Sequence, residues 1–272
     1  MVSAEERAAL PPELLGKYHC LVAALRKAGP GAVAFSGGVD STLLLRAAWE
    51  AYGPDAQAMY VRSPLQKPRV LERVRLTCRQ LECPLRIVEV DPLSWPEFAA
   101  NSDLRCYHCK KKIYTYLTSL LASGYKLLDG TNLDDLEQDR PGLRAVRELH
   151  VQTPLVEAGL TKREVRLLCR AWRLDCWNLP SESCLATRVA AGVAITPELL
   201  RDVACGENFL EDKGFFGCRA RLDGRSVFIS LSQGDIERFL ERGLREEVRN
   251  FFAKLNYTKV FLELSERPGI LN

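Results

Sequence analysis

Short apolar runs alternate with amphipathic segments along the first half of the chain. Four runs bounded by glycine, proline or polar residues predict buried strands, at residues 32–35, 56–61, 85–90 and 126–128. Between them, apolar positions recur at helical spacing and predict helices, at 14–28, 41–52, 70–81 and from 106 onward. Strands joined by helices of this length indicate an α/β fold with a doubly wound parallel sheet.

The second half of the chain has a different order of elements. Thr161 and Glu164 form a capping-box pattern that predicts a helix over 161–172. A helix, two hairpin strands, a second helix and a last strand are then predicted, at 196–213, 218–222, 226–231, 235–255 and 259–264. This order indicates a smaller α+β domain, so we predict an α/β domain over 1–180 and a C-terminal domain over 181–272.

Composition narrows the functional classes. The 272 residues include 38 basic and 35 acidic side chains, and the net charge of +3 does not indicate a nucleic-acid partner. No apolar run is long enough to span a bilayer or resembles a signal peptide, so we expect a cytoplasmic protein without a membrane partner. Ten cysteines in a chain of this kind favour metal or sulfur chemistry over disulfides.

The segment SGGVDS, residues 36–41, lies between the first strand and its helix. Gly37 and Gly38 allow backbone N–H groups to approach an anion, and the helix presents its unpaired N–H groups to the same place. A Walker A loop would have a lysine where this chain has Asp40. The pattern therefore predicts a phosphate-binding loop of another class, with an ordinary glycine-rich turn as the alternative.

Cys106 and Cys109 form a C-x-x-C pair at a predicted helix start. Two thiols at this spacing can face one metal or cluster, and the helix N-terminus favours their thiolate forms. No second C-x-x-C or paired histidine motif is present, so a metal site needs a third ligand from elsewhere, and two incidental thiols are the alternative. Lys110, next along the helix, is a candidate phosphate contact or a solvated charge.

Two further segments carry candidate site residues. Asp129 follows the strand at 126–128 and is a candidate ligand for a ribose, an adenine edge or Mg²⁺, with a plain Asx turn as the alternative. Cys184 lies in an irregular loop at 178–188, as a candidate nucleophile, sulfur carrier or third metal ligand, or as an inert thiol. Arg219 and Arg221 alternate on one strand face and are candidates for binding a phosphate.

Seven segments resemble the LarE family, in the same order and over most of the chain. They are SGGVDSTLLL, RCYHCK, DGTNLDD, RPGLRAVREL, EAGLTKREVR, PSESCLATR and the CRAR strand. The resemblance implies a PP-loop (N-type) ATP pyrophosphatase domain, which is similar to the adenine nucleotide alpha hydrolases. It also implies an ATP-dependent sulfurtransferase that acts on pyridinium-3,5-biscarboxylic acid mononucleotide in nickel-pincer nucleotide synthesis. ATP would adenylate a ring carboxylate, and a sulfur nucleophile would displace AMP to give a thiocarboxylate.

The resemblance also implies roles for individual residues. Asp40 and Cys184 would be catalytic, and Arg188, Arg219 and Arg221 would face the substrate. Glu207 matches a family metal or site carboxylate. Ser36, Gly37, Gly38, Asp40 and Ser41 would bind the ATP phosphates. Lys110 and Asp129, chosen from their places in the sequence, are the other expected contacts to ATP or Mg²⁺.

The family is known in two forms, which differ in the source of sulfur. We expect the form with a [4Fe-4S] cluster, held by Cys106, Cys109 and Cys184, whose open iron would bind hydrosulfide. The alternative is a sacrificial Cys184 that gives up its own sulfur. Other readings are a tRNA-thiolating PP-loop enzyme and a nucleotide-binding regulator without catalysis. Expected partners are the mononucleotide, a sulfide source, other enzymes of the pathway and further copies in a homo-oligomer.

Overall fold

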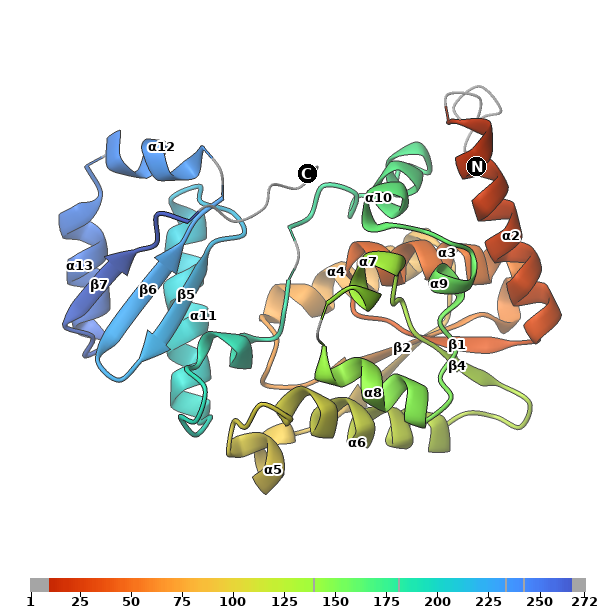
Figure 1. The fold of residues 1–272 in the computed structure, drawn as a ribbon, viewed down its shortest axis with the longest axis horizontal. Helices are drawn as coiled ribbons and strands as arrows, with labels where there is room; N and C mark the ends of the chain where they lie inside the picture. Colours follow the sequence, from red (N-terminus) through yellow and green to blue (C-terminus); the bar gives the residue numbers. More distant parts are fainter. Residues whose placement is uncertain (1–9, 139, 181, 233, 242, 266–272) are drawn as a thin grey trace. The chain divides into compact units, whose positions relative to one another are not determined.

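The computed structural model describes residues 10–138, 140–180, 182–232, 234–241 and 243–265. The chain divides into two compact units (Figure 1). The first takes in Met1–Ser63, Pro68–Val90 and Leu104–Leu179. The second takes in Pro64–Lys67, Asp91–Asp103 and Pro180–Asn272. Two short segments that precede residue 104 thus belong with the C-terminal part of the chain rather than with the residues around them.

The first unit contains a parallel sheet of four strands in the order β3-β2-β1-β4. Their bounds are β1 Gly31–Ala34, β2 Gln57–Arg62, β3 Leu85–Glu89 and β4 Lys126–Leu128. All four were predicted from apolar runs, and the α/β class with a parallel sheet is confirmed. Because β1 lies between β2 and β4, the loops that follow β1 and β4 leave the sheet as neighbours.

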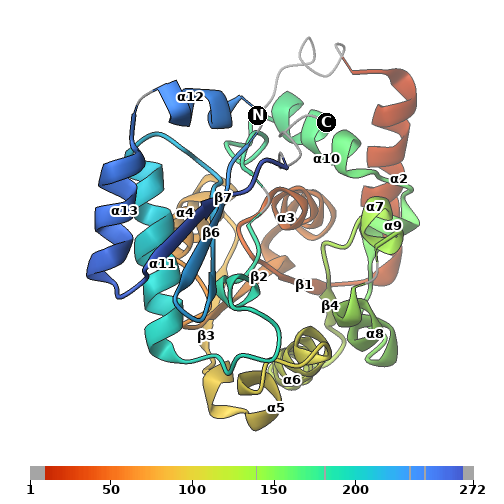
Figure 2. The same cartoon turned by 60° about the vertical axis from the view of Figure 1, so that its left-hand side comes forward.

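Alternating strand residues pack against helices on the two faces of this sheet. Val33, Ala58 and Leu128 belong to one apolar cluster, and Ala32, Met59 and Leu127 belong to the other. The first cluster includes residues of α2 Pro12–Ala28, α3 Val39–Tyr52, α4 Pro68–Gln80, α9 Pro154–Glu157 and α10 Lys162–Ala171. The second includes residues of α6 Arg105–Ser119 and α8 Pro141–Glu148. Figure 2 shows α3 and α6 on opposite sides of the strands.

The second unit contains a three-stranded sheet in the order β5-β6-β7. β5 Arg219–Asp223 pairs antiparallel with β6 Ser226–Ser230, and β6 pairs parallel with β7 Lys259–Leu262. The turn between β5 and β6 contains Gly224 at φ +55°, as the predicted hairpin requires. α11 Pro197–Asp212 begins at Thr196, whose hydroxyl accepts a hydrogen bond from Leu199 N at 3.3 Å.

The segment 91–103 is joined to the C-terminal part of the chain by specific hydrogen bonds. Asn101 Nδ2 donates to the carbonyl oxygens of Ala190 at 2.7 Å and Val193 at 2.8 Å. Ile195 N donates to Ala99 O at 2.8 Å. These bonds explain why residues far apart in sequence form one unit.

The predicted helix over 235–255 is wrong in one respect, because the structure has two helices there. α12 Asp235–Glu241 and α13 Arg245–Lys254 are separated by Gly243 at φ +62°. A residue in this left-handed region cannot continue a right-handed helix, and glycine takes the conformation at no steric cost.

The remaining elements are short. They are 3₁₀ turns at Gly53–Asp55, Pro92–Ser94 and Leu185–Arg188, α5 Pro96–Ala99 and α7 Leu133–Leu136. Within the described ranges, none of the helices combines the length and the apolar character that crossing a bilayer demands.

Candidate active site

The glycine-rich loop joins β1 to α3, and its shape depends on Gly37. This residue has φ +73°, and a Cβ on it would lie 2.8 Å from Val74 Cγ2. Any side chain here would therefore be strained and would collide with α4. Arg73, also on α4, donates from Nε to Gly37 O at 3.0 Å and fixes the loop.

The two serines of the loop fold it back onto the start of α3. Ser36 Oγ and Ser41 Oγ are 3.0 Å apart, and Ser41 Oγ donates to Gly38 O at 3.1 Å. Gly38 N donates to Ser36 Oγ at 3.3 Å. Because Gly38 at the N-cap has no side chain, no side-chain cap covers the first turn of α3. The loop and the helix start together form an arrangement suited to an oxyanion.

Asp40 connects the loop to two other elements of the first unit. Its Oδ1 accepts a hydrogen bond from Asn132 Nδ2 at 3.1 Å, and its Oδ2 is paired with Lys162 Nζ. Asn132 follows β4 and Lys162 begins α10, so three segments meet at one carboxylate. The lysine was not predicted as a site residue. The available signal was the capping box at Thr161 and Glu164, which the structure confirms, and which places the next residue at a helix start.

Asp129 is buried and fully bonded. Thr131 N donates to Asp129 Oδ1 at 2.7 Å, the hydroxyls of Thr131 and Tyr114 also donate to the carboxylate, and Lys110 Nζ lies 3.0 Å from Oδ2. Burial alone would raise the pKa of Asp129, but the Lys110 ammonium and the two hydroxyls outweigh it and lower the pKa below its usual value. Asp129 is therefore a carboxylate at neutral pH, and Lys110 is held beside it.

The turn after β4 closely approaches the start of α3. A Cβ on Gly130 would lie 3.0 Å from Ser41 N, so a side chain here would require the backbone at the start of α3 to shift by a few tenths of an ångström. The structure thus brings together the residues predicted to bind ATP, namely Ser36, Gly37, Gly38, Asp40, Ser41, Lys110 and Asp129. Lys162 and Asn132 join them.

The C-x-x-C pair lies at the start of α6, as predicted. Cys106 and Cys109 are half-buried and one helical turn apart, and Arg105 Nη2 donates to Cys106 Sγ at 3.6 Å. Cys184, also half-buried, belongs to the second unit. Within the described residues, no three His, Cys, Asp or Glu side chains form a group that holds a metal.

The turn that carries Cys184 is bonded to Arg188. Arg188 Nη1 donates to Ser183 Oγ at 2.6 Å and to Cys184 O at 3.3 Å, and Nε donates to Glu207 Oε1 at 2.7 Å. Lys67 Nζ lies 2.8 Å from the other oxygen of Glu207 and 3.0 Å from Glu211 Oε1. Arg188 and Glu207 are therefore bonded to protein groups in a buried position. Nothing in the sequence around Lys67 or Glu211 indicated this network.

Arg219 and Arg221 lie on the same face of β5, because buried Ala220 and Leu222 alternate with them. Arg221 is half exposed, and its Nη1 donates to Glu263 Oε1 at 3.2 Å. This partner was not predicted. A guanidinium bonded to one carboxylate on an open sheet face still has donors for a phosphate.

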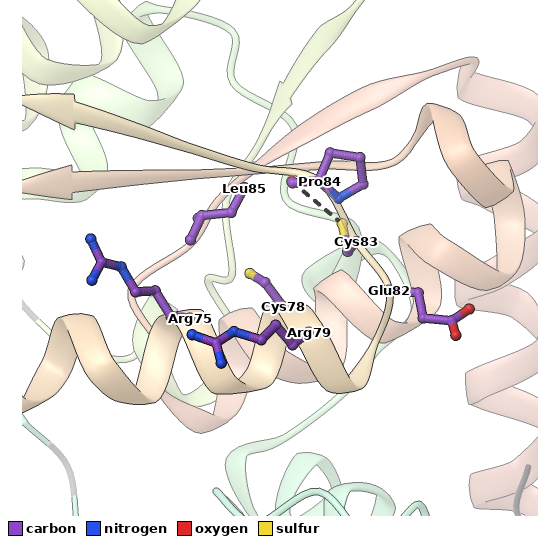
Figure 3. Close-up of a pocket in the computed structure, with 7 residues that line it drawn as sticks. All are labelled: Arg75, Cys78, Arg79, Glu82, Cys83, Pro84 and Leu85. Atoms are coloured by element: carbon purple, nitrogen blue, oxygen red, sulfur yellow. Dashed lines mark hydrogen bonds between the residues drawn. The ribbon is translucent and has the colours of Figure 1, made fainter.

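A separate pocket lies at the amino end of β3 and contains none of the predicted site residues. It is lined by Arg75, Cys78, Arg79, Glu82, Cys83, Pro84 and Leu85 (Figure 3). Burial raises the pKa of Cys78 to about 12 and that of Cys83 to about 11. These thiols therefore stay protonated at neutral pH, and since parallel strands begin here, the pocket is at the sheet edge opposite to the glycine-rich loop.

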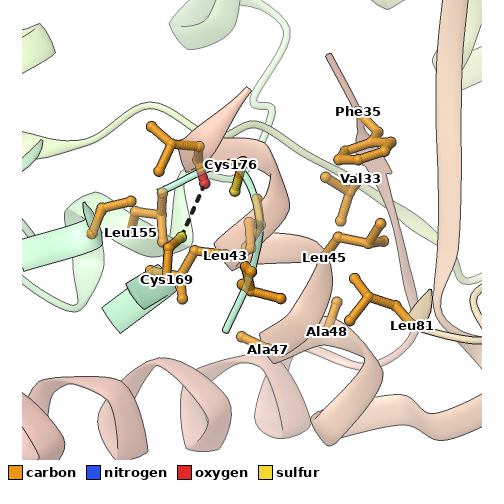
Figure 4. Close-up of a cluster of buried hydrophobic side chains, with 14 of the residues drawn as sticks. Val33, Phe35, Leu43, Leu45, Ala47, Ala48, Leu81, Leu155, Cys169 and Cys176 are labelled. Carbon is orange, nitrogen blue, oxygen red and sulfur yellow. Dashed lines mark hydrogen bonds between the residues drawn. The ribbon is translucent and has the colours of Figure 1, made fainter. Parts of the chain in front are cut away.

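Two other buried thiols lie behind the glycine-rich loop. Cys169 Sγ donates to Val39 O at 3.6 Å, at the start of α3, and Cys176 lies in the same apolar cluster (Figure 4). Burial raises the pKa of Cys169. Both thiols pack with leucine and valine side chains, so they support the loop from the core.

Comparison with known proteins identifies relatives along most of the chain. No protein-family profile matches it. The chain is 33% identical over 243 residues to slr1717, an uncharacterised protein of Synechocystis, and covers 91% of it. It is 26% identical over 234 residues to the uncharacterised MJ0830 of Methanocaldococcus jannaschii, covering 88%. It is 30% identical over 263 residues to the pyridinium-3,5-bisthiocarboxylic acid mononucleotide synthase of Lactiplantibacillus plantarum, and the match covers 95% of each chain.

This last match runs through both units and includes every segment on which the predicted resemblance depends. The chain therefore belongs to the LarE family, that of the Lactiplantibacillus plantarum synthase.

Proposed function

We propose that this chain is an ATP-dependent sulfurtransferase that converts a carboxylate of pyridinium-3,5-biscarboxylic acid mononucleotide to a thiocarboxylate. The observation that carries the proposal is the match along 95% of both chains to a synthase named for the bisthiocarboxylic product. The arrangement around the glycine-rich loop supports an ATP-dependent route to that product.

In the proposed reaction, ATP binds with its phosphates at the glycine-rich loop and the start of α3. A carboxylate oxygen of the substrate attacks the α-phosphorus, and pyrophosphate leaves with the electrons of the broken P–O bond. Lys162 and Lys110 supply positive charge for the leaving group, since each ammonium is partly exposed beside a carboxylate. The backbone N–H groups of the loop hold the phosphates without a charged side chain.

The donor set also fits Mg²⁺. Mg²⁺ typically takes one or two carboxylates together with phosphate oxygens and water, and Asp40 is a partly exposed carboxylate beside the proposed phosphate position. When bound, the ion would neutralise charge on the phosphates. Asp40 then has two tasks in this proposal, to orient Lys162 and to hold the ion.

Arg219 and Arg221 are proposed to bind the phosphate of the mononucleotide. They lie on one sheet face at strand spacing, and their planar donor groups suit a phosphate. Arg188 and Glu207, predicted as substrate contacts, are bonded to other buried groups. We propose that they shape the turn at Cys184.

We consider two routes for sulfur delivery, the two that are expected from the family. The thiols of Cys106, Cys109 and Cys184 suit a [4Fe-4S] cluster in chemistry, because cluster ligands are cysteine thiolates and all three are half-buried. A bound cluster would offer an open iron for hydrosulfide. In the second route, the Cys184 thiolate attacks the adenylated carbonyl and AMP leaves. Loss of the Cα proton of Cys184 then breaks the Cβ–S bond, which releases the thiocarboxylate with the electrons of that bond and leaves dehydroalanine.

The proposal is tested with anaerobically purified protein, ATP and the mononucleotide. We expect equal amounts of AMP and pyrophosphate, together with a thiocarboxylate product seen by mass spectrometry. A regulator without catalysis would form no AMP, and a tRNA-thiolating enzyme would need tRNA for turnover. Iron and sulfide quantification, with the mass of the chain after turnover, separates the cluster route from the sacrificial one. We also propose that the protein is cytoplasmic and that it forms a homo-oligomer. Light scattering after gel filtration tests the oligomeric state.

A further inference from the structure

Four charged side chains of the second unit are almost inaccessible to water. Lys67 is 8% exposed, Arg188 5%, Glu207 1% and Glu211 6%. Two cations face two carboxylates, so the group is neutral as a whole. Charged groups are rarely buried to this extent unless each one is paired, and here each has a partner within 3.0 Å.

The network is a chain of contacts that ends at the cysteine-bearing turn. Lys67 Nζ is 2.8 Å from Glu207 Oε2, and Glu207 Oε1 is 2.7 Å from Arg188 Nε. On the other side of the guanidinium, Arg188 Nη1 lies within hydrogen-bond distance of four oxygens of the turn. These are Ser183 Oγ at 2.6 Å, Thr187 Oγ1 at 2.7 Å, Ser183 O at 3.1 Å and Cys184 O at 3.3 Å.

The turn has two further attachments. Thr187 donates to Cys184 O from Oγ1 at 2.8 Å and from its backbone N at 3.0 Å, so with Arg188 this carbonyl oxygen has three donors. Leu185 N donates to Leu65 O at 2.8 Å. The segment 64–67 therefore reaches the turn directly through its backbone and indirectly through Lys67.

We propose that Lys67 is a positioning residue for Cys184, acting through Glu207 and Arg188. Its relevance to sulfur transfer rests on the proposed function, whereas its effect on the turn does not. The ammonium holds one oxygen of Glu207 and thereby directs the other toward Arg188 Nε. Because a guanidinium is planar and rigid, fixing Nε also fixes the direction of Nη1 toward the turn.

Loss of the Lys67 ammonium would leave the buried network with two carboxylates and one guanidinium, which is bonded to Glu207. Such a site relaxes by protonation of a carboxyl group or by movement of a charged side chain toward water. Either change weakens the Glu207–Arg188 bond, and the turn then opens more often. A displacement of about 1 Å at a reacting group can lower a rate about 100-fold, so sulfur transfer is sensitive to this movement.

The test is the alkylation rate of Cys184 in the full chain carrying Lys67→Met, measured with iodoacetamide and peptide mass spectrometry. Cys20 and Cys205 are exposed and serve as standards in the same sample. We expect Cys184 to react about tenfold faster than in the wild type while both standards stay unchanged. Lys67→Arg keeps the charge and should return the rate to within about twofold of the wild type.

Lys213→Met is the matched control, since Lys213 pairs with Glu247 in the same unit but at its surface. We expect it to leave Cys184 labelling at the wild-type rate. If Lys67→Met fails to fold, Glu207→Gln replaces it as a variant of equal size, with a smaller increase of about threefold expected. Unchanged or slower labelling of Cys184 in a folded Lys67→Met or Glu207→Gln protein overturns the proposal, as does an equal increase in Lys213→Met.

A second readout separates this proposal from the proposed function. In Lys67→Met, pyrophosphate release should stay within about twofold of the wild type, while thiocarboxylate formed per pyrophosphate falls about tenfold. A wild-type chain that forms no pyrophosphate refutes the proposed function, yet the labelling result still decides whether Lys67 positions the turn.

Discussion

The charged networks of the two units differ in how much water reaches them. In the first unit, the side chains of Lys162 and Lys110 are 29% and 27% exposed beside Asp40 and Asp129. In the second unit, Lys67 and Arg188 are below 10%. Both networks pair lysine or arginine with carboxylates at hydrogen-bond distance, so the difference is in accessibility and not in chemistry.

This difference separates a network that can exchange partners from one that cannot. A partly exposed lysine loses little when it leaves a carboxylate for a phosphate, because water and ligand replace the bond. A buried ammonium has no such replacement, and breaking its pair costs about 3–5 kcal/mol. The first network is therefore suited to binding a ligand, and the second to holding a backbone turn in place.

The largest expected effect is at the partly exposed network of Asp40, Asp129, Lys110 and Lys162, which we call the open network. Asp40→Ala should lower ATP-dependent pyrophosphate release at least about 100-fold, because the lysine and the metal ion lose their common partner. The fold should remain, since the Asp40–Lys162 pair is partly exposed. Pyrophosphate assays and a thermal melt measure both quantities. Asp55→Ala, an exposed acid after α3, is the control, and full release by Asp40→Ala would contradict the adenylation mechanism.

We call the buried group of Lys67, Arg188, Glu207 and Glu211 the closed network. There, Glu207→Ala should lower the free energy of unfolding by about 3–5 kcal/mol, because it leaves Lys67 and Arg188 buried with one carboxylate. Glu247→Ala, which removes a surface partner of Lys213, should cost about 0–1 kcal/mol. Urea unfolding followed by circular dichroism measures both. Similar values for the two variants would remove the distinction between the networks.

Arg219→Ala and Arg221→Ala test whether the open sheet face binds the mononucleotide. Each should weaken binding by about 1.5–3 kcal/mol, the usual range for a hydrogen bond to a charged group, while ATP affinity changes little. Isothermal titration calorimetry measures both ligands. Arg249→Ala, at an exposed helix position, is the control. Wild-type affinity for the mononucleotide in both variants would exclude this face as the phosphate site.

The smallest effect concerns acid stability through Asp129. Its pKa is lowered in the folded protein, so its carboxylate stabilises the fold above its unfolded pKa of about 3.9, and this contribution is lost as the pH falls below that value. Asp129→Asn should therefore reduce the difference in stability between pH 7 and pH 3. Urea midpoints at the two pH values measure it. An unchanged difference would mean that Lys110 does not stabilise this carboxylate.

Much of the first unit was predictable because its signals are local. Each parallel strand is a short apolar run, and each residue predicted to bind ATP, except Lys110 inside α6, follows such a run or begins a helix. The neighbouring positions of Asp40 and Asp129 depend on the strand order β3-β2-β1-β4, which the sequence pattern did not predict. Lys162 was missed because the sequence around it, Thr161 to Glu164, was interpreted only as a helix cap and not as part of a binding site. The break at Gly243 was missed because apolar positions keep helical spacing on both sides of it.

The closed network was not predictable for the opposite reason. Lys67 lies between β2 and α4, and its partner Glu211 is 144 residues further along the chain. A lysine in a polar loop has no local pattern that marks it as buried, and glutamates at 207 and 211 match any helix surface. Only the tertiary structure shows that these groups share one interior site.

The divided second unit has a consequence for the order of events during synthesis. Pro64–Lys67 and Asp91–Asp103 leave the ribosome well before Pro180–Asn272, the rest of their unit. At about 5–20 residues per second, the 144 residues between Lys67 and Glu211 take about 7–30 s to translate. During that time the Lys67 ammonium stays hydrated and Asn101 lacks its acceptors. The first unit can therefore form its sheet before the second unit is synthesised. In a nascent chain that stops before α11, the carboxylate partners of Lys67 are missing and Lys67 stays exposed to water.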